Sequence, residues 1–127
     1  MKVIDASAMI DLLTGTERAS RVASLLDDDL YAPDLLVAEV FSFLRRMSNN
    51  KRMTDAAADS LAEATEQAPV EYLHSWMYSS RIWQLRHTMS SYDATYVALA
   101  EDLGSPLITT DLRLARAATG LVPILSV

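Results

Sequence analysis

The stretch SSYDATYVALAEDLGSPLITTD, residues 90–111, contains the pattern that decides the fold. Apolar residues recur at helical spacing in its first half and predict a helix over 91–103, which Gly104 ends. A short apolar strand follows at 106–109. Asp111, a residue type that often caps the start of a helix, predicts a further helix after it. Short apolar strands that alternate with helices are typical of α/β domains with a parallel sheet.

The same alternation runs outward from this stretch to both ends of the chain. Apolar runs predict the remaining strands at 2–5, 30–32, 70–73 and 122–125. Helical spacing and turn residues predict the remaining helices at 6–13, 17–28, 34–48, 55–67, 75–87 and 112–118. Thr16 and Thr54 are predicted helix caps, Pro33 starts a helix, and Pro123 places the last strand at an edge of the sheet. We therefore expect one α/β domain over residues 1–127, with a central, mostly parallel sheet of four to five strands and helices on both faces.

Composition excludes most other kinds of catalytic site. The chain has 127 residues, no cysteine, three glycines and two histidines. Without cysteine there are no disulfides, thiolate zinc sites or cysteine nucleophiles. The glycines are too far apart for GxGxxG, GxxxxGK(S/T) or GxSxG, and the histidines do not form HExxH. Carboxylates remain as the catalytic groups.

Charge and hydropathy limit the partners. The 17 acidic and 11 basic residues give a net charge of −6, so binding of nucleic acid needs a local basic patch or a metal. Asp5 interrupts the N-terminal apolar run far short of a signal peptide. No uncharged apolar stretch approaches the roughly 20 residues that span a bilayer. We therefore expect a cytoplasmic protein without a membrane partner.

Four acidic residues stand at positions that the fold alone does not require. Asp5 and Asp111 follow predicted strands, at the edge of a parallel sheet where ligands bind. Glu39 borders the apolar side of its predicted helix, and Asp93 opens the helix at 91–103. Each has a structural interpretation as well, because the aspartates suit helix starts and Glu39 suits a buried salt bridge.

Taken together, the four carboxylates indicate a bound cation. Like charges at one edge repel one another unless a positive group compensates them, and only Arg113 lies within two residues of any of them. Oxygen ligands suit Mg²⁺ or Mn²⁺ rather than zinc. Without these four acids the net charge of the rest would be only 11 − 13 = −2.

Four segments resemble those of PIN-domain ribonucleases, and more narrowly the VapC toxins of bacterial type II toxin–antitoxin pairs. These segments are VIDAS at 3–7, VAEV at 37–40, SYDATYVALA at 91–100 and LITTD at 107–111. The resemblance covers nearly the whole chain and includes the order of the acids. It implies an acidic quartet that binds Mg²⁺, with two supporting hydroxyls: Asp5, Glu39, Asp93 and Asp111, with Ser7 and Thr110.

Such a site would hydrolyse RNA with a metal-activated water and leave a 5′-phosphate and a 3′-hydroxyl. We expect Asp5 and Asp93 to be the central ligands and Arg113 to contact phosphate. Two other groups have two interpretations each, RNA contact or structure: the basic residues Arg45, Arg46, Lys51 and Arg52, and the aromatic residues Trp76, Tyr78, Trp83 and Tyr92. For the first group the pattern favours a solvated helix end, and for the second a core or dimer face. His74 and His87 receive no role.

The resemblance also implies partners. A VapB-like antitoxin would cover the acidic cleft, often with a basic side chain inserted among the carboxylates. The chain would form a homodimer, and it would meet promoter DNA only through the antitoxin.

Two other functions differ from a nuclease in what they need from the sequence. A phosphate-receiving signalling domain needs adjacent acids after the first strand, an aspartate after the third and a late lysine. Here Asp5 stands alone, Leu73-His74 follows the third strand, and Lys51 is the last lysine. A catalytically silent PIN-like domain, which uses its acidic cluster only for metal or partner binding, fits the sequence as well and stays open.

Overall fold

A computed structural model describes residues 1–27 and 29–127, and within them the strands form one parallel sheet. The strands are β1 (Lys2–Ile4), β2 (Leu30–Pro33), β3 (Val70–Leu73), β4 (Leu107–Thr109) and β5 (Ile124–Ser126). Their order is β3-β2-β1-β4-β5, and every neighbouring pair is parallel. The predicted parallel sheet is confirmed.

The strand order reverses between β1 and β4. The chain moves outward from β1 to β2 and β3, and then returns to the other side of β1 with β4. Ligands of open α/β sheets bind at such a switch point, beside the carboxyl ends of the strands. The two residues that end these strands are Ile4 and Thr109, so the polar residues that follow them face this crevice.

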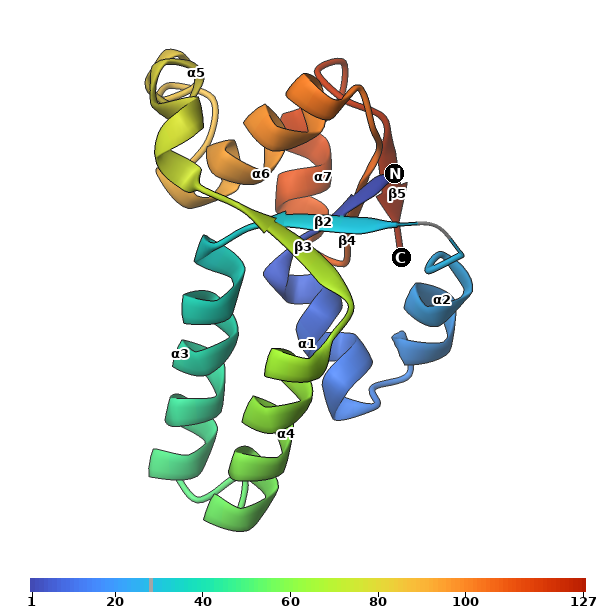
Figure 1. Ribbon diagram of the computed structural model, residues 1–127, viewed down its shortest axis with the longest axis vertical. Helices are drawn as coiled ribbons and strands as arrows, with labels where there is room; N and C mark the ends of the chain where they lie inside the picture. The colour runs from blue at the N-terminus through green and yellow to red at the C-terminus, as the bar shows by residue number, and fades with distance from the viewer. Residues whose placement is uncertain (28) are drawn as a thin grey trace.

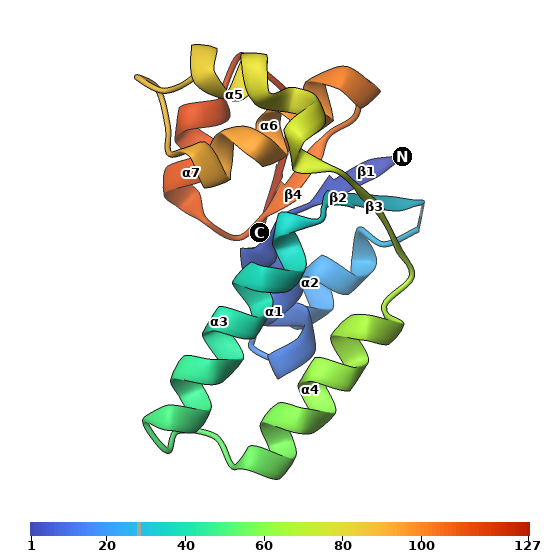
Figure 2. The same ribbon diagram turned by 60° about the vertical axis from the view of Figure 1, so that its left-hand side comes forward.

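Two layers of helices cover the sheet (Figures 1 and 2). On one face lie α1 (Ala6–Thr14), α2 (Ala19–Ser24), α3 (Leu35–Asn49) and α4 (Asp55–Gln67). On the other lie the 3₁₀ turn η1 (Ser75–Tyr78), α5 (Ser79–Gln84), α6 (Ser91–Leu103) and α7 (Leu112–Ala118). Within the described residues, no helix is long and apolar enough to cross a bilayer.

The centre of the core is α6, which packs against β1, β2 and β4. Every residue from Ala94 to Ala100 is buried, so the helix is enclosed on all sides rather than along one stripe. Its small alanines allow the strands to approach closely, and Val3, Ile4 and Ile108 of the sheet are fully buried. The first turn of α6 is therefore held firmly at the switch point.

Several predicted boundaries on the N-terminal side are wrong. The helix expected at 17–28 is only Ala19–Ser24, and its expected end at Asp28 lies outside the described residues. Thr16 does not cap it, since its hydroxyl accepts a hydrogen bond from the N–H of Arg18 in the preceding turn. Pro33 ends β2 instead of starting α3.

The C-terminal half has two further differences. The single helix expected at 75–87 is divided into η1 and α5, and α5 ends at Gln84. The last strand begins at Ile124, two residues later than expected, because Pro123 offers no N–H to β4 and contributes only its carbonyl, to Leu107. The edge position of β5 is confirmed.

Candidate active site

Asp5 lies where β1 passes into α1, and its residue surface is only 3% exposed. One carboxylate oxygen, Oδ1, accepts hydrogen bonds from the backbone N–H of Ala8 at 2.9 Å and the hydroxyl of Ser7 at 2.7 Å. The other, Oδ2, accepts from the hydroxyl of Thr109 at the end of β4. Asp5 does cap α1, but the cap uses Oδ1 alone and leaves Oδ2 facing the switch point.

Burial makes the ionised form of Asp5 costly. The pKa of Asp5 is raised from 3.8 to about 6, chiefly by desolvation and to a smaller extent by the negative charge of Asp111. The hydrogen bonds from Thr109, Ala8 and Ser7 lower it and offset only part of the rise. A helix cap does not need a carboxylate this deeply buried, whereas a cation would stabilise its charge.

Asp111 begins α7 and is linked to Asp5 through Thr109. Its Oδ1 accepts from the backbone N–H groups of Arg113 at 2.9 Å and Leu114 at 3.2 Å, so it caps the helix as expected. Its own N–H donates to the Thr109 hydroxyl at 3.0 Å, and that hydroxyl donates to Asp5. The other oxygen, Oδ2, lies 3.2 Å from the guanidinium Nη2 of Arg113.

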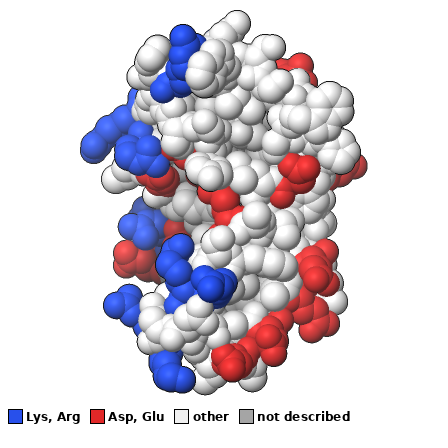
Figure 3. Space-filling model, turned by 90° about the vertical axis from the view of Figure 1, so that its left-hand side faces the viewer, with Lys and Arg blue, Asp and Glu red and all other residues white. Residues whose placement is uncertain are grey.

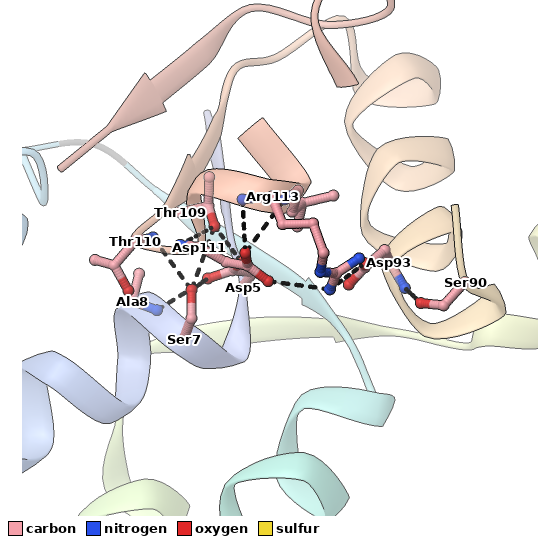
Figure 4. A network of polar contacts seen from close by, with 10 residues as sticks. Asp5, Ser7, Ala8, Ser90, Asp93, Thr109, Thr110, Asp111 and Arg113 are labelled. Carbon is pink, nitrogen blue, oxygen red and sulfur yellow. Dashed lines mark hydrogen bonds and ion pairs between the residues drawn. The ribbon is translucent and has the colours of Figure 1, made fainter. Parts of the chain in front are cut away.

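Asp93 stands in the first turn of α6, where its backbone N–H donates to the capping hydroxyl of Ser90 at 3.1 Å. Its Oδ2 is buried and receives no hydrogen bond of good geometry from the described residues. The same oxygen lies 2.9 Å from Nη2 of Arg113, a contact of opposite charges rather than a directional bond. The guanidinium of Arg113 therefore joins Asp93 and Asp111 (Figure 4). Contact with the carboxylate of Asp93 is the main reason that the pKa of Arg113 is raised.

Glu39, on α3, accepts a hydrogen bond from the hydroxyl of Tyr96 at 2.7 Å. Desolvation raises the pKa of Glu39, and the nearby charge of Asp93 raises it further. Burial and Glu39 together hold the pKa of Tyr96 well above its usual range, so that its hydroxyl stays a donor. No lysine or arginine of the described residues forms a salt bridge with Glu39, so the buried salt bridge expected as an alternative is wrong.

The structure brings the four acids into one connected cluster. Asp5 joins Asp111 through Thr109, Asp111 joins Asp93 through Arg113, and Asp93 influences Glu39 by its charge. On the face where α3 and α5 come forward, acidic side chains lie at the hollowed waist of the molecule, with lysine and arginine side chains along one flank (Figure 3).

The cluster has the chemistry of a site for a hard divalent ion. Its donors are carboxylate oxygens, one of them buried and without a hydrogen bond from the residues that the structure describes, and two of its acids already share a positive group. As the side chains stand, no three acids or histidines of the described residues are arranged to hold one ion together. Arg113 instead supplies the positive charge between two of them.

Two functional side chains were missed from the sequence. The hydroxyl that reaches Asp5 across the sheet is that of Thr109, whereas Thr110 contributes its backbone N–H to Ser7 Oγ at 3.1 Å. Ser7 itself lies as expected, bonded to Asp5. The other is Tyr96, which was given no functional role, although its spacing of three residues from Asp93 places both on one side of the helix.

The tryptophans are not core residues. Trp76 is 74% exposed and Trp83 68%, and Tyr92 is also exposed, whereas Tyr78 is buried as the core interpretation expects. Arg86 lies over the ring of Trp83.

Comparison with known proteins agrees with this geometry. Residues 2–120 match the family model of the PIN domain. The chain is similar to Ribonuclease VapC3 of Mycobacterium tuberculosis, with 44% identity over 117 residues that cover 91% of this chain and 85% of the relative.

Two solved structures share the fold. PAE2754 from Pyrobaculum aerophilum has a TM-score of 0.74 at 21% identity and covers 98% of this chain and 89% of its own. VapBC2 from Rickettsia felis, bound to a DNA fragment from its promoter, has a TM-score of 0.68 at 10% identity and covers 98% and 97%. Because the family model spans nearly the whole chain and the relative is closely similar along it, this chain belongs to the PIN-domain family, and within it to the VapC group.

Proposed function

We propose that this chain is a Mg²⁺-dependent endoribonuclease and the toxin of a VapBC-type toxin–antitoxin pair in the cytoplasm. The observation that carries the proposal is the cluster of four carboxylates at the switch point, in which Asp93 and Asp111 share one positive group. The name of the relative from Mycobacterium tuberculosis, a ribonuclease, supports RNA as the substrate.

The residues that would hold the ion are the acids of the cluster. Bound there, Mg²⁺, or Mn²⁺ in its place, would supply an activated water and neutralise charge on the scissile phosphate. Asp93 offers a buried oxygen without a hydrogen bond, and Asp111 lies across from it. Asp5 is linked to Asp111 through Thr109, and burial raises its pKa more than its three hydrogen bonds lower it, which supports a cation beside it. Glu39 is oriented by Tyr96 at the outer side of the cluster.

Arg113 would act on the substrate. Its side chain is 66% exposed although its guanidinium touches two acids, so it can turn toward solvent without opening the core. With a metal between the carboxylates, the guanidinium is free to contact a phosphate of the RNA. We assign it to phosphate binding.

The partner we propose is a VapB-like antitoxin. VapBC2, which shares the fold, was solved as a complex bound to promoter DNA, which supports an antitoxin partner for this chain and DNA contact through that partner. We further propose that the chain forms a homodimer.

Cleavage of a mixed RNA preparation tests the function. We expect fragments with 5′-phosphate ends in Mg²⁺, no cleavage in EDTA, and a loss of about 100-fold or more in Asp93→Asn, because a ligand should matter at least as much as the residues that orient it. Asp59→Asn, an exposed acid on α4, is the matched control and should cleave like the parent. A clean preparation that binds Mg²⁺ and cuts no RNA would instead favour the catalytically silent domain.

A further inference from the structure

A hollow of about 480 Å³ adjoins the acidic cluster, between α1, α3 and the start of α6. It shares Ser7 and Glu39 with the cluster, so the two form one continuous surface. Its size lies within the roughly 300–1,000 Å³ of sites that bind small molecules or parts of larger ones. The hydrogen bonds within the acidic cluster do not account for this hollow.

The walls of the hollow combine an apolar surface, an aromatic ring and a positive charge. Ile10 and Phe43 contribute apolar side chains, and Tyr92 lies at its border with 62% of its surface exposed. Arg46 also lines it, with its guanidinium carbon 5.8 Å from the centre of the Phe43 ring. An apolar wall with an aromatic face and a nearby cation matches a nucleobase and its phosphate.

Within the described residues, the charge of Arg46 meets only the ring of Phe43, and Tyr92 is left exposed. Tyr92 is a large aromatic residue that is exposed to solvent at the start of α6, although the stretch from Ala94 to Ala100 of the same helix is buried. Arg46 forms no ion pair among the described residues, in contrast to Arg81, which binds Glu101, and Arg113. In a protein with a net charge of −6, an unpaired cation beside the acidic cluster favours an anionic ligand.

We propose that this hollow binds the nucleobase next to the scissile phosphate of a single-stranded RNA, with Tyr92 stacking on the base and Arg46 contacting an adjacent phosphate. The proposal rests on the proposed nuclease function. The hollow is lined by Tyr92 and also by Ser7 and Glu39 of the cluster, so a base stacked on the Tyr92 ring would place the neighbouring phosphate beside the carboxylates. A base can enter only when it is unstacked from its neighbours, which selects single strands.

The test measures RNA binding separately from cleavage. In an Asp93→Asn background, the affinity for a pool of fluorescein-labelled 12-nucleotide single-stranded RNAs is measured by fluorescence anisotropy. Because the loss of base stacking weakens binding by about 5- to 160-fold, we expect Tyr92→Ala to raise Kd within that range and Tyr92→Phe to restore it. Trp83→Ala removes an exposed aromatic residue that does not line the hollow and should leave Kd unchanged. For a duplex RNA of the same length, the Tyr92 variants should have the same Kd as the Asp93→Asn protein.

Arg46 is tested by salt dependence. Arg46→Ala should lower the slope of log Kd against log salt by about 0.7, the value for one lost phosphate contact on a single strand. Arg45→Ala is the matched control, because Arg45 is the neighbouring exposed arginine of α3 and faces α4 instead of the hollow. Circular dichroism melts should show that all variants are folded.

Each outcome decides between the proposals. An unchanged Kd in both Tyr92→Ala and Arg46→Ala would overturn the base-binding proposal, even if the parent chain cleaves RNA. A protein partner would then be the remaining occupant for the hollow. Cleavage failing in the parent while Tyr92 and Arg46 still govern RNA affinity would contradict the nuclease function and support the RNA site. A loss of affinity that is equal for single-stranded and duplex RNA would also overturn base stacking.

Discussion

At the scale of single residues, Asp5 shows how one side chain serves both the fold and the site. Its Oδ1 caps α1 through Ala8, as a helix-starting aspartate should, while its Oδ2 receives the hydroxyl of Thr109 from across the sheet. The cap was predictable from local sequence because capping depends on a few neighbouring residues. The contact with Thr109 was not, because it joins residues 104 positions apart.

The buried carboxyl of Asp5 should make the metal-free protein less stable as the pH rises. Its pKa is about 6 in the folded protein and near 3.8 in the unfolded chain, so the folded state binds the proton more tightly. Protonation of Asp5 contributes about 3 kcal/mol to the free energy of unfolding. This contribution is complete below about pH 4 and is lost as the pH rises through about 6. We expect Asp5→Asn to unfold at higher urea concentration than the parent at pH 8 in EDTA and to lose that advantage at pH 4. A variant that is less stable at both pH values would show that the carboxyl group of Asp5 supports the fold in either protonation state.

Arg113 provides a second test at this scale, since it lies where an ion would compete with it. Arg113→Gln removes the positive charge between Asp93 and Asp111, so we expect Mn²⁺ to bind about two- to fivefold more tightly, measured by isothermal titration calorimetry. Arg116→Gln, one turn further along α7, is the control and should bind Mn²⁺ like the parent. Weaker binding in Arg113→Gln would mean that Arg113 orients the ligands instead of competing with the ion.

At the scale of elements, α6 organises the site because it is enclosed on all sides. Its range and its end at Gly104 were predicted from the sequence, since a helix end depends on local hydrogen bonds and backbone conformation. The division of 75–87 into η1 and α5 was not, because the exposed Trp76 and Trp83 give the segment an apolar content that imitates a buried helix. Exposure depends on what packs against a segment, which a single sequence does not record.

The hydrogen bond between Tyr96 of α6 and Glu39 of α3 joins the two helix layers across the cluster. Tyr96→Phe removes the donor and leaves a half-buried carboxylate without it, so we expect a loss of about 1–2 kcal/mol in the free energy of unfolding, measured in urea at pH 7. RNA cleavage should fall as well, because Glu39 loses the contact that orients it. Tyr92→Phe removes a hydroxyl from an exposed tyrosine of the same helix and should not change stability. Equal stability in both variants would exclude this bond as a link between the layers.

At the scale of the whole molecule, the strand order determines which acids can meet. The α/β class followed from alternating strands and helices, and the carboxyl-edge positions of Asp5 and Asp111 followed from the parallel sheet. The neighbouring position of β1 and β4, and the place of Arg113 between two acids, depend on tertiary packing and appeared only in the structure.

Binding of a divalent ion should stabilise the entire domain, since the cluster is assembled from α1, α3, α6 and α7 only in the folded state. At a Mg²⁺ concentration 100 times Kd the gain is about 2.7 kcal/mol, which should raise Tm by several degrees in differential scanning calorimetry at pH 7.5. Asp93→Asn should lose most of this rise, and Asp59→Asn should keep it. A melt that is insensitive to millimolar Mg²⁺ in the parent would count against the metal site.

The placement of β4 beside β1 also affects when the acidic cluster can form during synthesis. Asp5 precedes Thr109, Asp111 and Arg113 by more than 100 residues along the chain, although β1 and β4 are neighbours in the sheet. A growing polypeptide that has not yet reached β4 lacks the strand that completes the centre, so the four acids can meet only after that strand has left the ribosome.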